Sequence, residues 1–294
     1  MPEKDSVFLE SRLSEDNFEK IQILHNRKLN RFVAETIQRC NPKSVFICTD
    51  AEEDIQYVRR KAIENGEEAL LKNPNQTLHF DGYYDQARDK ANTKYLVPPG
   101  MDLGASINWI NKERGLNEIH SFLRNIMRGK EMVVRFFSLG PTNSVFSIAA
   151  VQITDSAYVA HSEDLLYRPG YEQFKKLDDP DEFFCVLHSA GELVDSVSAN
   201  LDLRRIYIDI EDEIVYSVNT QYAGNTVGFK KLALRLAIRK ADREGWLAEH
   251  MLLMGVHGPG GRVTYFAGAF PSFCGKTSTA MLPGETIVGD DIAY

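Results

Sequence analysis

The sequence predicts a mixed α/β fold, because helical and extended patterns alternate and several extended segments follow one another directly. Apolar residues recur at helical spacing over residues 17–39, and the apolar stretch 44–48 that follows has the length of a buried strand. Strand patterns then dominate the middle of the chain, at 132–137, 144–153, 183–187, 205–210 and 214–218. A sheet with both parallel and antiparallel neighbours is therefore expected.

The helices and loops around these strands are predicted from their terminating residues. The first helix should end at Asn41-Pro42, since proline cannot continue a helix. Glycines end the later helical patterns, which cover residues 51–65, 108–128 and a segment from Gly224-Asn225-Thr226 to Glu244. Residues 72–104 are rich in Asn, Asp, Gly and Pro and are predicted to be a surface loop. Two more strands are expected at 250–256 and 262–269.

Composition limits the classes of partner. The 294 residues hold 34 Lys and Arg against 42 Asp and Glu, a formal net charge of -8, which argues against a nucleic-acid or anionic-membrane binder. The N-terminus is too charged for a signal peptide, and no run of 18 apolar residues exists. The four cysteines lie far apart, without the spacing of a disulfide framework or a thiolate zinc site. We expect a cytoplasmic protein with no nucleic-acid or membrane partner.

One helical segment reverses the sign of the net charge. Between Thr226 and His250 there are six Lys or Arg and three Asp or Glu, in a chain that is acidic overall. Such a local excess of positive charge suits an anionic ligand. A charge cluster alone is more often a solvated helix face, so this observation by itself does not establish an anionic ligand.

The strongest chemical motif follows the strand predicted at 262–269. The segment 270–277 reads Phe-Pro-Ser-Phe-Cys-Gly-Lys-Thr and leads into a helix. A strand, a tight loop and Gly-Lys-Thr at a helix start form the arrangement that binds phosphate through backbone N–H groups and a lysine. The general pattern also has glycine where this chain has Phe270. From that pattern alone, a phosphate loop and a chance turn both remain possible.

A pair of acids strengthens the phosphate-loop interpretation. The apolar stretch 286–288 leads through Gly289 to Asp290 and Asp291. A buried strand that delivers carboxylates beside a phosphate loop is how such folds hold Mg²⁺ or Mn²⁺. The alternative is an exposed acidic turn. The Gly-Lys-Thr motif, fourteen residues before this pair, favours the metal site.

Four stretches together resemble the GTP-dependent phosphoenolpyruvate carboxykinases. They are residues 270–277, the Gly-Asp-Asp-Ile-Ala run at 289–293, Glu-Gly-Trp-Leu-Ala-Glu-His-Met at 244–251, and Tyr-Ala-Gly-Asn at 222–225. Weaker matches occur at 136–141, 154–159 and 187–189, so the resemblance spans roughly residues 80–294. It accounts for Phe270, because the GTP-using branch of the family has Phe-Pro-Ser in place of a Gly-rich loop.

The resemblance implies a fold and a domain order. It predicts a polar lead-in at 1–15, an N-terminal substrate-binding α/β domain at 16–245, and an incomplete P-loop nucleotide- and metal-binding domain at 246–294. The family's catalytic region continues well past the position matched by Tyr294. We therefore expect the chain to be truncated and inactive alone, with a C-terminal half as a possible partner.

The resemblance also implies a metal centre. In the family a Lys, a His and an Asp bind a catalytic Mn²⁺, which corresponds to Lys230, His250 and Asp291 here, with Lys231 as an alternative to Lys230. A lysine ligand must be neutral, so its pKa of about 10.4 must be lowered by the metal charge and by burial. Thr277 and Asp290 would serve a second Mg²⁺ or Mn²⁺ that arrives with GTP.

The remaining roles also follow from the resemblance. Catalytic roles are implied for Arg88, Cys274 and Lys276, although the reaction requires no cysteine nucleophile. The substrate-binding residues would be Arg88, Tyr222, Ala223, Gly224 and Ser272. The nucleotide-binding residues would be Phe273, Cys274, Gly275, Lys276, Thr277 and Ser278.

The implied reaction converts oxaloacetate and GTP to phosphoenolpyruvate, GDP and CO₂ through a Mn²⁺-stabilised enolate, in gluconeogenesis or anaplerosis. Oxaloacetate, phosphoenolpyruvate, GTP and GDP would thus be the small-molecule partners. Two alternatives remain open. One is another P-loop kinase, which would give no role to Lys230 and His250. The other is a non-catalytic nucleotide-binding fragment.

Overall fold

The computed structural model describes residues 4–80, 82–83, 89–221, 229–271 and 274–294. The chain divides into two compact units, Met1–Leu232 and Ala233–Tyr294. We call them unit 1 and unit 2 and describe each by itself. Among the described residues, no helix has both the length and the apolar character needed to cross a bilayer.

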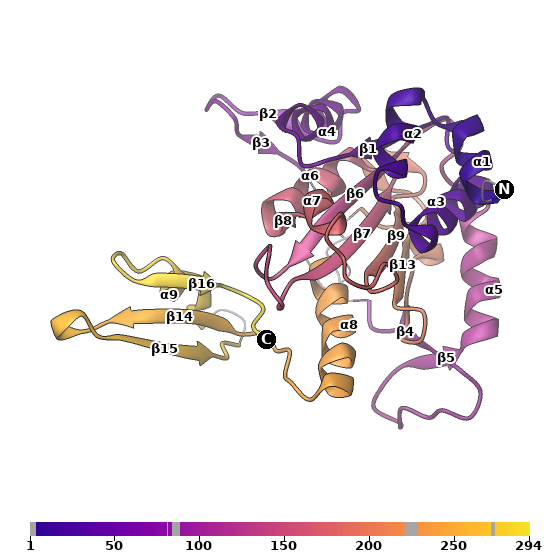
Figure 1. Cartoon of the computed structure of the whole chain (residues 1–294). Helices are drawn as coiled ribbons and strands as arrows, with labels where there is room; N and C mark the ends of the chain where they lie inside the picture. Colours follow the sequence, from indigo (N-terminus) through magenta and orange to yellow (C-terminus); the bar gives the residue numbers. More distant parts are fainter. Residues whose placement is uncertain (1–3, 81, 84–88, 222–228, 272–273) are drawn as a thin grey trace. The chain divides into compact units, whose positions relative to one another are not determined.

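Unit 1 contains a large mixed sheet with helices on both faces (Figure 1). Its helices are α1 (Lys4–Arg12), α2 (Glu15–Gln22), α3 (Arg27–Cys40), α4 (Glu52–Glu64), α5 (Lys112–Leu123), α6 (Ala157–Leu166) and α7 (Tyr171–Phe174). Its sheet strands are β1 (Ser44–Cys48), β4 (Thr93–Val97), β5 (Trp109–Asn111), β6 (Glu131–Leu139), β7 (Ile148–Thr154), β8 (Arg168–Pro169), β9 (Phe184–Ser189), β12 (Arg205–Asp209) and β13 (Ile214–Val218). Two small hairpins pair β2 (Ala69–Leu70) with β3 (Thr77–Leu78), and β10 (Leu193–Val194) with β11 (Val197–Ser198).

The strand order of the sheet is β1-β6-β7-β9-β13-β12-β4-β5, with β8 paired to β6. The β1–β6, β7–β9, β9–β13, β12–β4 and β4–β5 pairs are parallel, whereas β6–β7 and β12–β13 are antiparallel. The expectation of a mixed sheet is therefore confirmed. This topology brings the carboxyl ends of β7, β9 and β13 and the amino end of β4 to one edge of the sheet.

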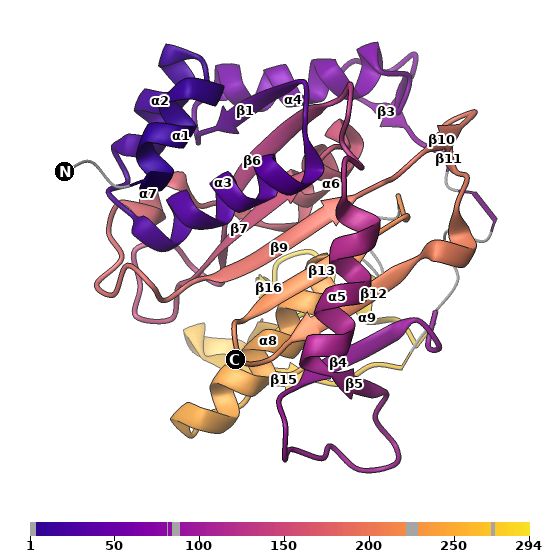
Figure 2. The ribbon, with the colours of Figure 1, turned by 90° about the vertical axis from the view of Figure 1, so that its right-hand side faces the viewer.

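The sheet separates two apolar layers, because alternate residues of each strand point to opposite faces. One layer packs the alternate β6 residues Met132, Val134 and Phe136 against α1, α2, α3, α5 and α7. Figure 2 shows α3 and α5 lying across the near side of the sheet. On the opposite face, Val133 packs with Val58 of α4 and Ala160 of α6. Coverage of the sheet on both faces explains why nearly every residue of β6, β7 and β9 is buried.

The N-terminal segments differ from the sequence prediction in two ways. The polar lead-in expected at 1–15 contains the helix α1, whose Leu9 is fully buried. The single helix expected over 17–39 is two helices, α2 and α3. His25 has a positive φ of 47°, and the side chain of Asn26 accepts a hydrogen bond from the Leu29 amide, which starts α3 as a new helix.

The prediction of a surface loop at 72–104 is also only partly correct. Strand β4 lies inside it and pairs with β12 and β5. β4 is a strand because of this tertiary pairing. The Asn, Asp and Gly residues around it are typical of a loop, so the local sequence does not indicate a strand. The helix predicted at 108–128 is shorter, because Trp109–Asn111 form β5 and the Asn111 side chain caps α5 at the Arg114 amide.

Unit 2 contains an antiparallel sheet in the order β15-β14-β16. Its strands are β14 (Leu252–His257), β15 (Val263–Gly268) and β16 (Thr286–Gly289), and the short helix α9 (Lys276–Ala280) follows β15. The helix α8 (Phe229–Glu244) begins in unit 1 and continues in unit 2. The strand predicted before Gly-Lys-Thr and the helix predicted to start at this motif are therefore confirmed.

Candidate functional site

The phosphate-loop motif lies at the start of α9. Gly275 has φ +93°, a conformation that residues with a Cβ rarely adopt, so glycine is required at this turn. Lys276 is the first residue of the helix, and Thr277 and Ser278 follow it with exposed side chains. The thiol of Cys274 is free and exposed. Ser272 and Phe273 lie outside the described residues.

Strand pairing brings His250 and Asp291 together. β14 pairs with β16 from Leu253 opposite Gly289, and Glu249 exchanges two backbone hydrogen bonds with Ala293 at 2.8 and 3.0 Å. Between these two pairings, the His250 Nε2 atom lies 2.5 Å from Asp291 Oδ1. The neighbouring Asp290 is exposed. Of the acidic pair, Asp291 is thus the member that the strands place opposite the histidine.

Lys276 contacts both of these residues. Its Nζ atom lies 2.9 Å from His250 Nε2 and also donates to Asp291 Oδ1. The Lys276 and Asp291 side chains are only 16% and 12% exposed, whereas His250 is 43% exposed. An imidazole nitrogen and a carboxylate oxygen thus converge on one cationic group inside unit 2. Lys230 and Lys231 lie in the first turn of α8, and their side chains fall outside the described part of the chain.

The described residues next to the segments expected to bind substrate lie at one edge of the unit 1 sheet. Arg88 precedes β4 by five residues, and Tyr222 follows the end of β13 by four. The amino end of β4 and the carboxyl end of β13 share that edge, because β4 is parallel and β13 antiparallel to β12. Arg88, Tyr222, Ala223 and Gly224 themselves lie outside the described residues.

A buried ion pair fixes the backbone next to Arg88. Arg204 Nε donates to Asp89 Oδ2 at 2.9 Å, with the side chains only 7% and 9% exposed. The Asp89 carboxylate also accepts hydrogen bonds from the backbone and side-chain nitrogens of Asn92, both at 3.0 Å. Burial raises the pKa of Asp89, but these hydrogen bonds and the guanidinium outweigh it and lower the pKa overall. The carboxylate is therefore well suited to stay ionised.

His188 fixes the backbone before Tyr222. His188 is a buried residue of β9. Its Nδ1 atom lies 2.7 Å from Thr154 Oγ1, and its Nε2 atom lies 2.7 Å from the Thr220 carbonyl oxygen. Because a carbonyl can only accept, Nε2 must carry the hydrogen and Nδ1 accepts from the Thr154 hydroxyl. Burial lowers the pKa of His188, which agrees with this neutral form.

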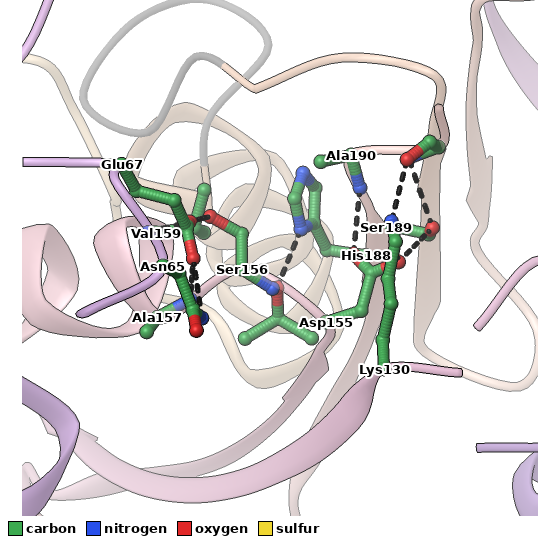
Figure 3. Close-up of polar contacts among 12 residues, drawn as sticks. Asn65, Glu67, Lys130, Asp155, Ser156, Ala157, Val159, His188, Ser189 and Ala190 are labelled. Atoms are coloured by element: carbon green, nitrogen blue, oxygen red, sulfur yellow. Dashed lines mark hydrogen bonds and ion pairs between the residues drawn. The ribbon is translucent and has the colours of Figure 1, made fainter. Parts of the chain in front are cut away.

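The same sheet edge holds a second polar cluster, shown in Figure 3. The Asp155 carboxylate accepts hydrogen bonds from Lys130 Nζ at 2.8 Å, Ser189 Oγ at 2.7 Å and the Ala190 amide at 2.8 Å. These contacts hold the chain where it leaves β9. No role was predicted for His188 or Asp155 from the sequence. The sequence pattern that could have indicated these residues is that polar residues directly follow two predicted strands, at 154–156 and 188–189.

Comparisons with known proteins match both parts of the chain to one family. The family model described as phosphoenolpyruvate carboxykinase N-terminal domain matches residues 31–242, which is more than half of the chain. The chain belongs to the phosphoenolpyruvate carboxykinase family. The model described as phosphoenolpyruvate carboxykinase C-terminal P-loop domain matches residues 246–294, the part that holds His250, Lys276 and Asp291.

Several relatives carry the name phosphoenolpyruvate carboxykinase [GTP]. One from Pyrococcus horikoshii is 59% identical over 287 residues, which cover 97% of this chain and 46% of the relative. Those from Sulfurisphaera tokodaii and Chlamydia abortus are 45% and 36% identical, over 98% and 93% of this chain and 45% and 48% of the relatives. The chain thus spans about half the length of the curated relatives it matches.

Proposed function

We propose that this chain supplies the oxaloacetate- and metal-binding residues of a GTP-dependent phosphoenolpyruvate carboxykinase. The observation that carries the proposal is the convergence of His250, Asp291 and the phosphate-loop Lys276 within unit 2. The names of the relatives support the same activity.

The donor atoms of this site suit a divalent metal. Imidazole nitrogen and carboxylate oxygen are both ligands for Mn²⁺, and the contacts of both atoms with the Lys276 ammonium support a shared cation site. Within the described residues, no group of three or more His, Cys, Asp or Glu side chains could hold a metal. Following the resemblance to the family, we propose Lys230, or Lys231 in its place, as the third protein ligand.

The proposed reaction breaks one C–C bond and transfers one phosphoryl group, so that one P–O bond breaks and another forms. Arg88 and the segment Tyr222–Gly224, with Ser272, would orient oxaloacetate. The C–C bond to the departing carboxylate then breaks, CO₂ leaves, and the electron pair forms the enolate. When bound, Mn²⁺ supplies Lewis-acid stabilisation of the negative charge that develops on the enolate oxygen.

Phosphoryl transfer completes the proposed reaction. The enolate oxygen attacks the γ-phosphorus of GTP, GDP leaves, and phosphoenolpyruvate is formed. Lys276 would stabilise the charge on the transferred group, and Thr277 and Asp290 would hold the Mg²⁺ or Mn²⁺ that accompanies GTP. Phe273, Cys274, Gly275 and Ser278 would complete the phosphate loop. We place this chemistry in the cytoplasm, without nucleic-acid or membrane partners.

The test is a product assay on a fused enzyme, in which residues 1–294 are joined to the part of the Pyrococcus horikoshii relative that lies beyond its matched segment. Phosphoenolpyruvate and pyruvate are measured separately with oxaloacetate, Mn²⁺ and either GTP or ATP. We expect phosphoenolpyruvate to form with GTP and far more slowly with ATP. A folded fused enzyme that made only pyruvate would contradict the proposal. The same assay on residues 1–294 alone tests the expectation that this chain does not form phosphoenolpyruvate unaided.

A further inference from the structure

Lys276 contacts the two residues proposed to bind the metal, which a phosphate-loop lysine is not required to do. The loop motif assigns this side chain to phosphate oxygens. In the structure, its ammonium group instead donates to Asp291 Oδ1 and lies 2.9 Å from His250 Nε2. All three residues belong to unit 2 and lie on separate segments: before β14, at the start of α9 and after β16.

The contact has an electrostatic reason. Asp291 is only 12% exposed, and a carboxylate withdrawn from water costs free energy unless a cation or hydrogen-bond donors compensate it. The Lys276 ammonium provides a positive charge and a donor at the carboxylate oxygen. It also keeps the Asp291 and His250 side chains directed toward one point.

One position cannot hold an ammonium group and a divalent cation together. Both are positively charged, and a metal held by His250 and Asp291 would need the oxygen and the nitrogen that Lys276 contacts. We propose that Lys276 is a built-in competitor of the metal: it neutralises Asp291 in the metal-free protein, and metal binding displaces it toward the phosphate site. This inference rests on the proposed metal site.

The exchange makes metal binding and phosphate binding depend on each other. A ligand that binds only one arrangement of a protein shifts the population toward that arrangement. The metal therefore favours the arrangement in which Lys276 is free to contact phosphate. By thermodynamic reciprocity, a phosphate group that binds Lys276 removes the competitor and raises the affinity for metal.

The first test is Mn²⁺ binding to residues 1–294, followed by the EPR signal of free Mn²⁺ at fixed pH and ionic strength. Lys276→Met removes the ammonium and keeps an unbranched side chain. We expect it to lower the Kd for Mn²⁺ about 5- to 150-fold, the usual range for coupled ligands. Lys240→Met is the matched control. It removes a lysine of α8 that pairs with Glu244 at 2.6 Å, and we expect it to leave the Kd unchanged.

Two outcomes would overturn different parts of this account. If His250→Gln and Asp291→Asn bind Mn²⁺ as tightly as the wild type, the proposed metal site is wrong, and the competition falls with it. If these variants lose binding but Lys276→Met binds Mn²⁺ no more tightly than the wild type, the metal site stands and the competition is refuted.

A second measurement distinguishes two ways in which Lys276 could weaken metal binding. Either the metal displaces the lysine from Asp291, or the lysine stays in place and repels the metal. Reductive methylation of Lys276, quantified by mass spectrometry, reports how free its amine is. Displacement predicts that Mn²⁺ raises the rate of Lys276 modification and leaves that of Lys240 unchanged. An unchanged or lower rate at Lys276 would show that the lysine does not leave Asp291 and would overturn the proposal.

Discussion

Asp291→Asn is expected to lower kcat for phosphoenolpyruvate formation by at least about 10²- to 10³-fold, the usual cost of removing one group that stabilises charge in a transition state. Asp291 Oδ1 lies 2.5 Å from His250 Nε2, at the point where we propose that the metal binds. Asparagine keeps the shape of the side chain but lacks the negative charge. The measurement is the rate of phosphoenolpyruvate formation by the fused enzyme with saturating Mn²⁺ and GTP.

The matched control is Asp242→Asn, the same substitution at a carboxylate of unit 2 that is 72% exposed and pairs with Arg239. We expect Asp242→Asn to keep wild-type kcat, because an exposed ion pair contributes little. If a folded Asp291→Asn enzyme retained more than a tenth of the wild-type rate, Asp291 would not belong to the reacting centre.

Among the substitutions proposed for this chain, Arg135→Met is expected to lower the free energy of unfolding most, by about 3–5 kcal/mol. Arg135 of β6 is fully buried and donates to Asp164 of α6 at 2.6 Å and to the Thr49 carbonyl oxygen at 2.8 Å. Its Nη1 atom lies 3.6 Å from Asp50. Burial raises the pKa of Asp164, and Arg135 offsets only part of this rise. Without the guanidinium, two carboxylates would lack their cation.

Urea unfolding of residues 1–294, followed by circular dichroism, measures this loss. The control is Arg239→Met, which breaks a 3.0 Å pair with Asp242 on the exposed side of α8 and should cost less than about 1 kcal/mol. The double variant Arg135→Met, Asp164→Leu should recover part of the stability, because it removes a buried charge together with its partner. Equal losses for Arg135→Met and Arg239→Met would contradict the role of Arg135.

The local chemistry of the sequence predicted much of the fold. The strand at 44–48, the helix at 51–65 and the strands of the middle section occur near their predicted positions, because their apolar patterns match the faces they bury. The prediction was wrong where pairing with a distant segment decides the structure. β4 is a strand because it pairs with β12, which follows it by more than one hundred residues. The break at His25–Asn26 depends on one capping side chain within an otherwise continuous helical pattern.

The residues of the site that belong to local motifs were predictable from the sequence, whereas those that depend on distant partners were not. The Gly-Lys-Thr motif and the acidic pair are local patterns, and both led to residues that the structure brings together. His250 could be singled out only through the family resemblance, because its approach to Asp291 depends on the pairing of β14 with β16. His188 and Arg204 were missed because their partners, Thr220 and Asp89, lie far from them in sequence.

The proposed function depends most directly on whether His250 binds the metal. The measurement is pulsed EPR of one equivalent of Mn²⁺ bound to residues 1–294, with ¹⁵N incorporated only in histidine so that lysine nitrogens give no ¹⁵N signal. We predict a ¹⁵N coupling that is lost in His250→Gln and retained in His257→Gln, the other histidine of unit 2, whose Nε2 lies 2.8 Å from Thr286 Oγ1. Mn²⁺ bound at one equivalent without ¹⁵N coupling, or with a coupling that survives in His250→Gln, would contradict the account.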